Sequence, residues 1–220
     1  MKKIFKNLED SISALLTEIE EENYVTAVTM GQQVMAEALS AWSKSHGSTQ
    51  EEMTAAMLLT PAVTAYSTAL SASGMALQAF GINLTVIANL TYHEQPIDNT
   101  VDYHDIMMQL YLSLWMRLAD VLSQLPPSQN EEALEHVHVI TMYIGAMLMY
   151  YSHNVGRHDH NHELLPVVYE ELDRITGFVG HLPYKDIPVG NLKVNPAAPQ
   201  PLMQDMIARA DAIGLLDLSE

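Results

Sequence analysis

The sequence predicts an all-α protein, an irregular multi-helix bundle of about seven or eight helices with two largely buried central helical segments. Apolar residues recur at intervals of three and four along most of the chain, which is the period of an amphipathic helix. Residues 53–93 and 136–156 contain no Asp, Glu, Lys or Arg, so a helix in either segment suits burial on most sides. With 220 residues, 48% of them hydrophobic, the chain can bury a full core.

Two amphipathic helices are predicted at the start of the chain, over residues 4–19 and 24–42. The apolar stripe of the first is Phe5, Leu8, Ile12, Leu15, Leu16 and Ile19. That of the second is Tyr24, Ala27, Val28, Gly31, Val34, Met35, Ala38 and Trp42. An acidic run over residues 18–22 separates the two stripes. We therefore expect an antiparallel helical hairpin.

The first uncharged segment follows a predicted helix start. Ser48-Thr49-Gln50-Glu51 matches a capping box, in which a hydroxyl and a carboxylate satisfy free amides of a helix. Pro61 and residues 71–74 are expected to divide the segment, because proline removes a helical donor and glycine weakens a helix. Its many Thr, Ser, Asn and Gln residues argue against a membrane hairpin. The favoured interpretation is a central helix pair, buried in the fold or at a subunit interface.

Helices are also predicted over residues 106–125, from 131 to about 152, over 164–175 and over 202–213. Pro126-Pro127 ends the first, Ser128-Gln129-Asn130-Glu131 forms another capping box, and Pro166 is tolerated in a first turn. Residues 177–201 are rich in proline and glycine, which predicts an irregular strap. The expected organisation is a helical bundle domain over 1–176, with the strap and a short C-terminal helix over 177–220 packing on the same domain.

The charge of the chain limits its partners. Asp and Glu number 27 against 10 Lys and Arg, a formal net charge of −17, so nucleic acid is not an expected ligand. The acidity leaves open a basic protein partner or mimicry of a nucleic-acid surface. Cysteine is absent and charges interrupt the apolar residues after Met1, so no disulfide framework or secretory signal is evident. A cytoplasmic location is expected by default.

Residues 153–163 give the strongest local signal for chemistry. Imidazole and carboxylate groups together suit a divalent transition metal such as zinc, iron, manganese or nickel. The candidate ligands are His153, His158, Asp159, His160 and His162. If a helix begins at His158, then His158 and His162 lie on adjacent turns of one face. The competing interpretation, which is favoured, is a solvated loop whose polar side chains cap the next helix.

Other catalytic patterns are weak or missing. His-Asp dipeptides at His104-Asp105 and His158-Asp159 resemble metal-ligating pairs, but such pairs are expected by chance in a chain with 10 histidines. The sequence has no Gly-x-Ser-x-Gly elbow and no glycine-rich phosphate loop after a strand. Whether the protein is an enzyme is left undecided.

Three functions follow as expectations. The first is a non-enzymatic helical interaction or structural protein, self-associating as a homo-oligomer through its uncharged apolar helices. The second is a metal-dependent helical enzyme or metal-binding protein that uses the His-rich residues 153–163. The third is an acidic surface that binds a basic partner or mimics nucleic acid. The sequence establishes no cofactor, and a divalent transition metal is the one candidate.

Overall fold

The computed structural model describes residues 1–46, 48–93, 101–124, 131–181 and 199–216, and these contain eight helices and no strand. The helices are α1 (Lys2–Glu20), α2 (Tyr24–Ser45), α3 (Thr49–Ala72), α4 (Ala76–Thr91), α5 (Val101–Gln124), α6 (Glu131–His158), α7 (Leu165–His181) and α8 (Pro199–Ala212). The predicted all-α bundle of about seven or eight helices is confirmed.

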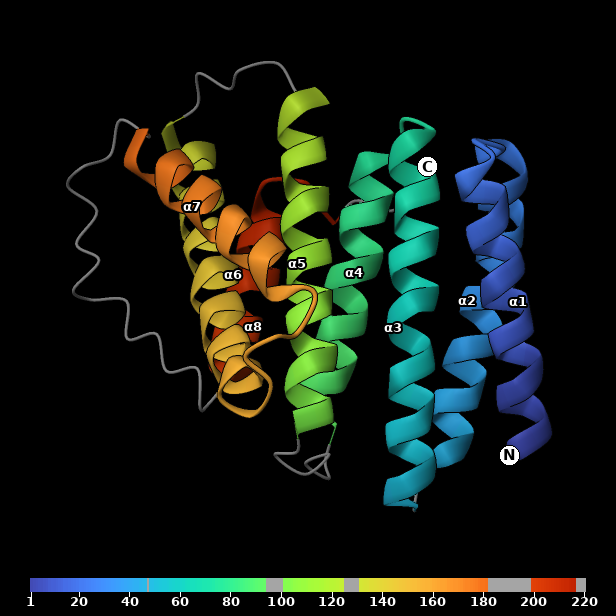
Figure 1. Ribbon diagram of the computed structural model, residues 1–220. Helices are drawn as coiled ribbons and strands as arrows, with labels where there is room; N and C mark the ends of the chain where they lie inside the picture. Colours follow the sequence, from blue (N-terminus) through green and yellow to red (C-terminus); the bar gives the residue numbers. More distant parts are fainter. Residues whose placement is uncertain (47, 94–100, 125–130, 182–198, 217–220) are drawn as a thin grey trace.

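The helices form three groups side by side (Figure 1). In the centre, α3, α4 and α5 pack against one another. The α1–α2 hairpin covers one side of this layer through α3, and α6, α7 and α8 cover the other side. One continuous cluster of buried apolar side chains runs through all three groups. The hydrophobic core therefore extends as one continuous layer between the three groups of helices.

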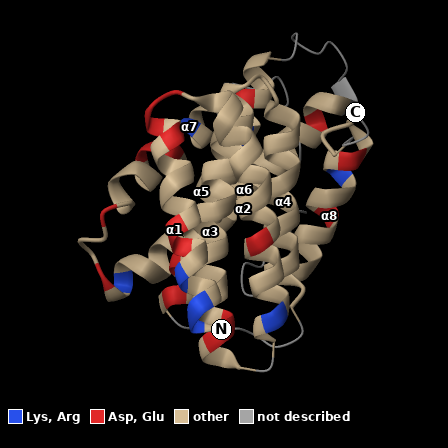
Figure 2. Ribbon diagram, turned by 90° about the vertical axis from the view of Figure 1, so that its right-hand side faces the viewer, with Lys and Arg blue, Asp and Glu red and all other residues tan. Residues whose placement is uncertain are grey.

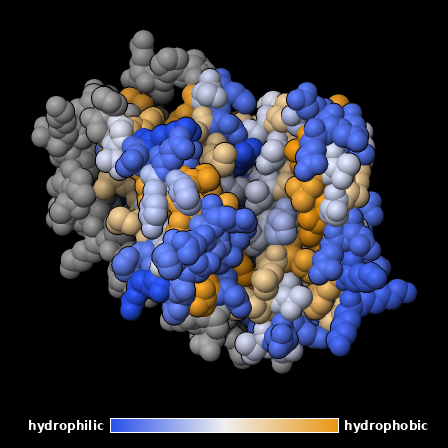
Figure 3. Space-filling view, viewed as in Figure 1, coloured by the Kyte–Doolittle hydropathy of each residue, from blue (hydrophilic) through white to orange (hydrophobic). Residues whose placement is uncertain are grey.

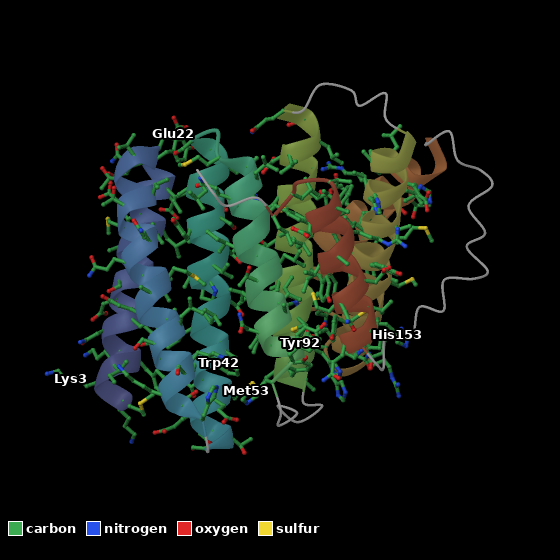
Figure 4. The ribbon with its side chains drawn as sticks, turned by 180° about the vertical axis from the view of Figure 1, so that it is seen from behind. Lys3, Glu22, Trp42, Met53, Tyr92 and His153 are labelled. Atoms are coloured by element: carbon green, nitrogen blue, oxygen red, sulfur yellow. The ribbon has the colours of Figure 1, made fainter. Side chains whose placement is uncertain are left out.

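The first hairpin forms as the spacing predicts. Leu8 and Leu15 on α1 are at most 1% exposed, and Ala27 and Ala38 on α2 are fully buried. Between the helices Glu22 has a φ of 61°, a left-handed conformation that costs a side-chain-bearing residue roughly 1 kcal/mol. Glu22 lies at the tip of the hairpin (Figure 4).

Helix α3 differs from its prediction at two points. It continues through Pro61 as one helix, so the expected division there is wrong. Ala62 and Val63 are fully buried beside the proline, and packing on both sides outweighs the one hydrogen bond that proline removes. Ser48 stands at the N-cap, but its side chain makes no capping bond, so this capping box is also wrong.

The turn from α3 to α4 is where the predicted break occurs. Gly74 has a φ of 82°, which an L side chain rarely adopts, and the amide of Met75 donates to Leu70 O at 2.9 Å. Glycine is needed here because the chain reverses within a few residues. The second proposed capping box, at residues 128–131, falls mostly outside the described residues.

Both uncharged segments lie in the interior, as predicted. Leu59 and Ala69 on α3, and Ile140 and Leu148 on α6, are fully buried. By length and composition α3 alone, among the described helices, passes for a membrane-crossing helix, but 56% of its most apolar window is buried against neighbours. The buried core helix of a soluble protein meets the same criteria of length and composition.

Polar side chains of α5 fix this helix relative to α7 and α3. The indole Nε1 of Trp115 on α5 donates to Glu171 Oε2 on α7 at 2.8 Å. Arg117 is 8% exposed and donates to the backbone oxygen of Ser67 on α3 at 3.2 Å. Each bond joins two elements distant in sequence, and each satisfies a polar group that burial would otherwise penalise.

The C-terminal region extends the bundle. Helix α7 continues past the predicted boundary at 176 as far as His181, and residues 182–198 of the predicted strap lie outside the described residues. Helix α8 then packs against α6 and α4. The Tyr143 hydroxyl donates to Asp205 Oδ2 at 2.7 Å, and Arg209 Nε donates to the same oxygen at 2.8 Å, which ties α8 to α6.

Candidate functional site

The five predicted metal ligands lie at the end of α6 and in the turn that follows it. Helix α6 continues to His158, so His153 and His158 are helical rather than part of a loop. His153, His158, Asp159 and His160 are exposed, and His162 is half-buried. Because the helix ends at His158, the two histidines expected on adjacent helical turns do not share a helical face.

His162 is engaged with two neighbours. The amide of Leu164 donates to its Nδ1 at 3.3 Å, and its Nε2 lies 3.2 Å from Asp105 Oδ1 at the start of α5. Since Nδ1 accepts a hydrogen bond, a neutral ring carries its proton on Nε2. The approach of Nε2 to Asp105 is a close contact and not a hydrogen bond, because Asp105 Oδ1 has no hydrogen-bond partner among the described residues. Asp159 stabilises the turn after α6, because its Oδ1 accepts a hydrogen bond from the amide of Asn161 at 3.0 Å.

Two of the remaining histidines of the segment share one pocket. His153 and His160 line a shallow pocket of about 270 Å³ together with Arg157 and Tyr169 (His153 is labelled in Figure 4). In the described part of the chain, no three His, Asp or Glu side chains come close enough to hold a metal ion. A divalent metal bound at residues 153–163 stays a prediction.

The structure brings the two His-Asp dipeptides together, which the sequence alone did not indicate. His104 is 7% exposed and lies within 6.3 Å, between ring centroids, of Tyr103, Tyr150 and Tyr151. Burial lowers the pKa of His104, and the neighbouring His158 lowers it further. His104 Nδ1 has no hydrogen-bond partner among the described residues. A signal existed, because His104 continues the buried stripe of α5 one turn toward the N-terminus.

The same cluster is rich in buried phenols. Tyr111 and Tyr151 are stacked at 5.8 Å between ring centroids and are at most 2% exposed. Burial raises the pKa of both hydroxyls far above the ordinary value for tyrosine. These hydroxyls therefore stay protonated at neutral pH and do not act as bases.

A groove of about 730 Å³ runs along α4. Its walls come from the end of α2, the start of α3, and α8 with the turn after it. The residues that line it are Trp42, His46, Glu52, Leu84, Thr85, Ala88, Asn89, Tyr92, His93, Ile207 and Leu216. Trp42 and Tyr92 are labelled in Figure 4.

One end of the groove holds a compact group of aromatic and ionisable side chains. The imidazoles of His46 and His93 are stacked with centroids 4.8 Å apart, and the ring of Trp42 meets both edge-on at 5.4 and 5.1 Å. His93 Nε2 lies 3.7 Å from the carboxylate of Glu52, which is 5% exposed. The group combines an apolar wall with a buried carboxylate and two imidazoles.

Sequence reasoning missed this group. The sequence places Trp42 on the apolar stripe of residues 24–42 and Glu52 next to the uncharged segment 53–93, and it assigns no role to His46. The signal was available in part, because Trp42 and His46 are four residues apart on one helical face. Their meeting with His93 depends on how α2 and α4 pack on α3, which spacing does not report.

The far side of the groove is fixed by contacts between α4 and α8. The Tyr92 hydroxyl donates to the backbone oxygen of Gln200 at 3.2 Å, and Gln200 Nε2 donates to Thr91 O at 3.4 Å. These bonds hold α8 against the end of α4, which fixes the position of the lining residue Ile207 on α8 relative to those on α4. Comparison with known proteins adds nothing to this geometry: no protein-family model, curated protein or solved structure matches the chain.

Proposed function

We propose that the protein is a non-enzymatic helical interaction protein that associates with a second copy of itself through the exposed side of α3. This α3 face consists of Met57, Pro61, Thr64 and Thr68, which recur at helical spacing and are exposed or half-buried. The observation that carries the proposal is that an interior helix leaves an uncharged stripe at the surface. Residues 53–93, which include most of α3 and all of α4, contain no Asp, Glu, Lys or Arg, and much of the ribbon in the middle of Figure 2 is tan.

The charge of the molecule supports this choice of face. Each copy has a formal net charge of −17, so two copies repel one another over most approaches. Association is least opposed where neither surface carries a carboxylate. At the edge of the α3 face, Asp120 is paired with Arg117 at 3.3 Å and accepts a hydrogen bond from Ser71 at 2.6 Å, so that charge is compensated.

Apolar exposure supports it too. Met57 is 52% exposed on α3, and Met116 on α5 is 43% exposed. Methionine side chains are flexible and adapt to a partner surface, and burying them is favourable. Figure 3 shows apolar and weakly polar side chains running between the hydrophilic surface of α1 and that of α7.

Light scattering coupled to size exclusion tests the proposal. Wild-type protein at micromolar concentration is expected to have a mass above that of one 24.5 kDa chain. Met57→Glu places an unpaired carboxylate in the interface, which costs about 3 kcal/mol or more. This cost raises the dissociation constant by more than about a hundredfold. Val25→Glu, at a position 84% exposed at the start of α2, is the matched control and leaves the mass unchanged.

A second variant distinguishes α3 from α6 as the helix that forms the interface. Met149→Glu lies on α6 at a position 60% exposed and leaves the mass unchanged if α3 is the interface. A monomeric wild type would overturn the proposal, as would dissociation by Met149→Glu but not by Met57→Glu. Far-ultraviolet circular dichroism checks that each variant retains its helices.

A further inference from the structure

The shallow pocket at the junction of α6 and α7 is built from two helices and the turn that joins them. Its lining residues are His153, Gly156, Arg157, His160, Leu165 and Tyr169. The first three lie on α6, the last two lie on α7, and His160 lies in the turn between the helices. The volume of about 270 Å³ is just below the roughly 300–1,000 Å³ of pockets that hold drug-sized ligands, so it suits a small molecule or ion.

The lining of this pocket reverses the charge of the chain as a whole. The chain has 27 Asp and Glu against 10 Lys and Arg, yet the described lining contains one arginine, two histidines, one tyrosine and no Asp or Glu. The exposed Asp159 and Glu163 are close in sequence but do not line the pocket. A guanidinium has five N–H donors and no acceptor, and an imidazole and a phenol each have at least one donor. The pocket therefore suits an anion that is rich in acceptors.

Arg157 is the arginine whose charge is left for a ligand. The other three arginines of the chain, Arg117, Arg174 and Arg209, each lie within 3.3 Å of a carboxylate oxygen. Within the described part of the chain, no ion pair joins Arg157 to a carboxylate. A cation in the last turn of α6 complements the helix dipole, but the dipole does not require two imidazoles and a phenol to line the same pocket.

We propose that this pocket binds a phosphate group, either as the free ion or at the end of a small phosphomonoester. The guanidinium of Arg157 donates two parallel hydrogen bonds to two phosphate oxygens. The imidazoles of His153 and His160 and the hydroxyl of Tyr169 supply further donors around the group. A phosphoryl group has at least three strong acceptor oxygens and up to two negative charges, whereas a carboxylate has two oxygens and one charge. Phosphate therefore satisfies more of these donors.

The same features oppose a metal cation in this pocket. The permanent positive charge of Arg157 repels a cation. His153 and His160 supply two ligands, where protein metal sites use three or more, and no such group of three is present among the described residues. These two histidines, which the sequence predicts as metal ligands, therefore suit an anion better where the fold places them in one pocket with Arg157.

Titration of the full chain with three probes tests the proposal. The probes are inorganic phosphate, phenyl phosphate and benzoate, each near neutral pH at constant ionic strength, and the amide NMR signals of residues 153–169 are followed. At least one phosphate probe is expected to bind with a dissociation constant of about 1 mM or less, and benzoate at least about tenfold more weakly, because it offers fewer charged hydrogen bonds. Tighter binding of phenyl phosphate than of phosphate would identify a phosphomonoester as the ligand, and the reverse would identify the free ion.

Two results of this titration would overturn the proposal. One is binding of benzoate as tight as that of both phosphate probes. The other is the absence of shifts in residues 153–169 with either phosphate probe, including the case in which signals shift only elsewhere.

Three variants assign the charge. Arg157→Gln should weaken binding of the phosphate probes by about tenfold or more, and Arg157→Lys should weaken it less, because lysine keeps the charge but loses the planar fork. Lys44→Gln changes the net charge equally at an exposed position of α2 outside the pocket, and should leave the affinity unchanged. If Lys44→Gln weakened binding as much as Arg157→Gln, net charge alone would explain the affinity and the assignment would be wrong.

Two further variants test the donors and the space. Tyr169→Phe removes the hydroxyl and keeps the ring. A Cβ atom at Gly156 would lie 3.5 Å from Leu165 Cδ1 and 3.7 Å from the Tyr169 hydroxyl, both ordinary contacts, so Gly156→Ala takes space in the pocket without displacing its walls. Each variant should weaken the phosphate probes severalfold. Unchanged affinity in both would place the probes outside the pocket.

A last comparison separates direct binding from binding through a metal. Phosphate binding that required added Zn²⁺ and persisted in Arg157→Gln would show a metal bridge and overturn the proposal. Met57→Glu should bind the phosphate probes normally, so this site and the interface on α3 are tested independently.

Discussion

Gly31→Ala tests the close packing of α2 on α3. A Cβ atom at Gly31 would overlap Cδ2 of Tyr66 on α3 and lie 3.0 Å from its Cγ and 3.2 Å from its Cβ. The atoms struck include the root of the tyrosine side chain, so the ring cannot simply turn away. In an open helix, replacing glycine by alanine stabilises by about 1 kcal/mol. Overpacking here costs roughly 2–3 kcal/mol, so a net loss of about 1–2 kcal/mol is expected.

Urea unfolding followed by circular dichroism measures this change in the free energy of unfolding. Gly177→Ala on α7 is the control, because nothing lies within 4 Å of the new Cβ atom, and it should stabilise by about 0.5–1 kcal/mol. In a Tyr66→Ala background, Gly31→Ala should also stabilise by about 1 kcal/mol, since the clash is gone. If Gly31→Ala stabilised the wild type as Gly177→Ala does, the reasoning about α2 and α3 would be refuted.

Three further predictions concern pH and metal. Burial alone would raise the pKa of Asp205, but hydrogen bonds from Arg209 and Tyr143 hold it below the ordinary value. Its ionised form therefore adds stability that is present above about pH 4 and is lost as the pH falls, and Asp205→Asn should flatten this part of an acid unfolding curve. Burial lowers the pKa of His104, so below about pH 6.5 the unfolded chain binds a proton at this residue before the folded protein does. The free energy of unfolding should therefore decrease as the pH falls below about 6.5, and it should decrease less in His104→Gln. Elemental analysis of tag-free protein should find no stoichiometric metal, because His162 is engaged elsewhere; one equivalent lost with alanines in segment 153–163 would favour the metal-binding alternative.

Spacing and charge predicted which surfaces are buried. The stripe containing Leu8 and Leu15 identified the inner side of α1, and the absence of charge identified α3 and α6 as core helices. Both follow from the cost of burying charge and the period of a helix, which are local properties of the chain. The helices and their order were therefore within reach of the sequence.

Contacts between residues on different helices could not be predicted from the sequence. The stack of His46 on His93 and the contact of His162 with Asp105 each join residues far apart in sequence, and helix periodicity says nothing of which helices meet. The continuity of α3 through Pro61 has the same origin, because local propensity disfavours it and tertiary packing sustains it. The candidate groove was missed for this reason, although each of its residues was visible.

The account depends on the uncharged helices being shielded from water by other helices, and native-state hydrogen exchange tests this most directly. Amides over residues 55–69 of α3 and 140–148 of α6 are expected to exchange only through global unfolding, more slowly than those near the exposed Gly177 of α7. Exchange in either segment as fast as at Gly177 would show that its helix opens independently to water, and would contradict the packing described above.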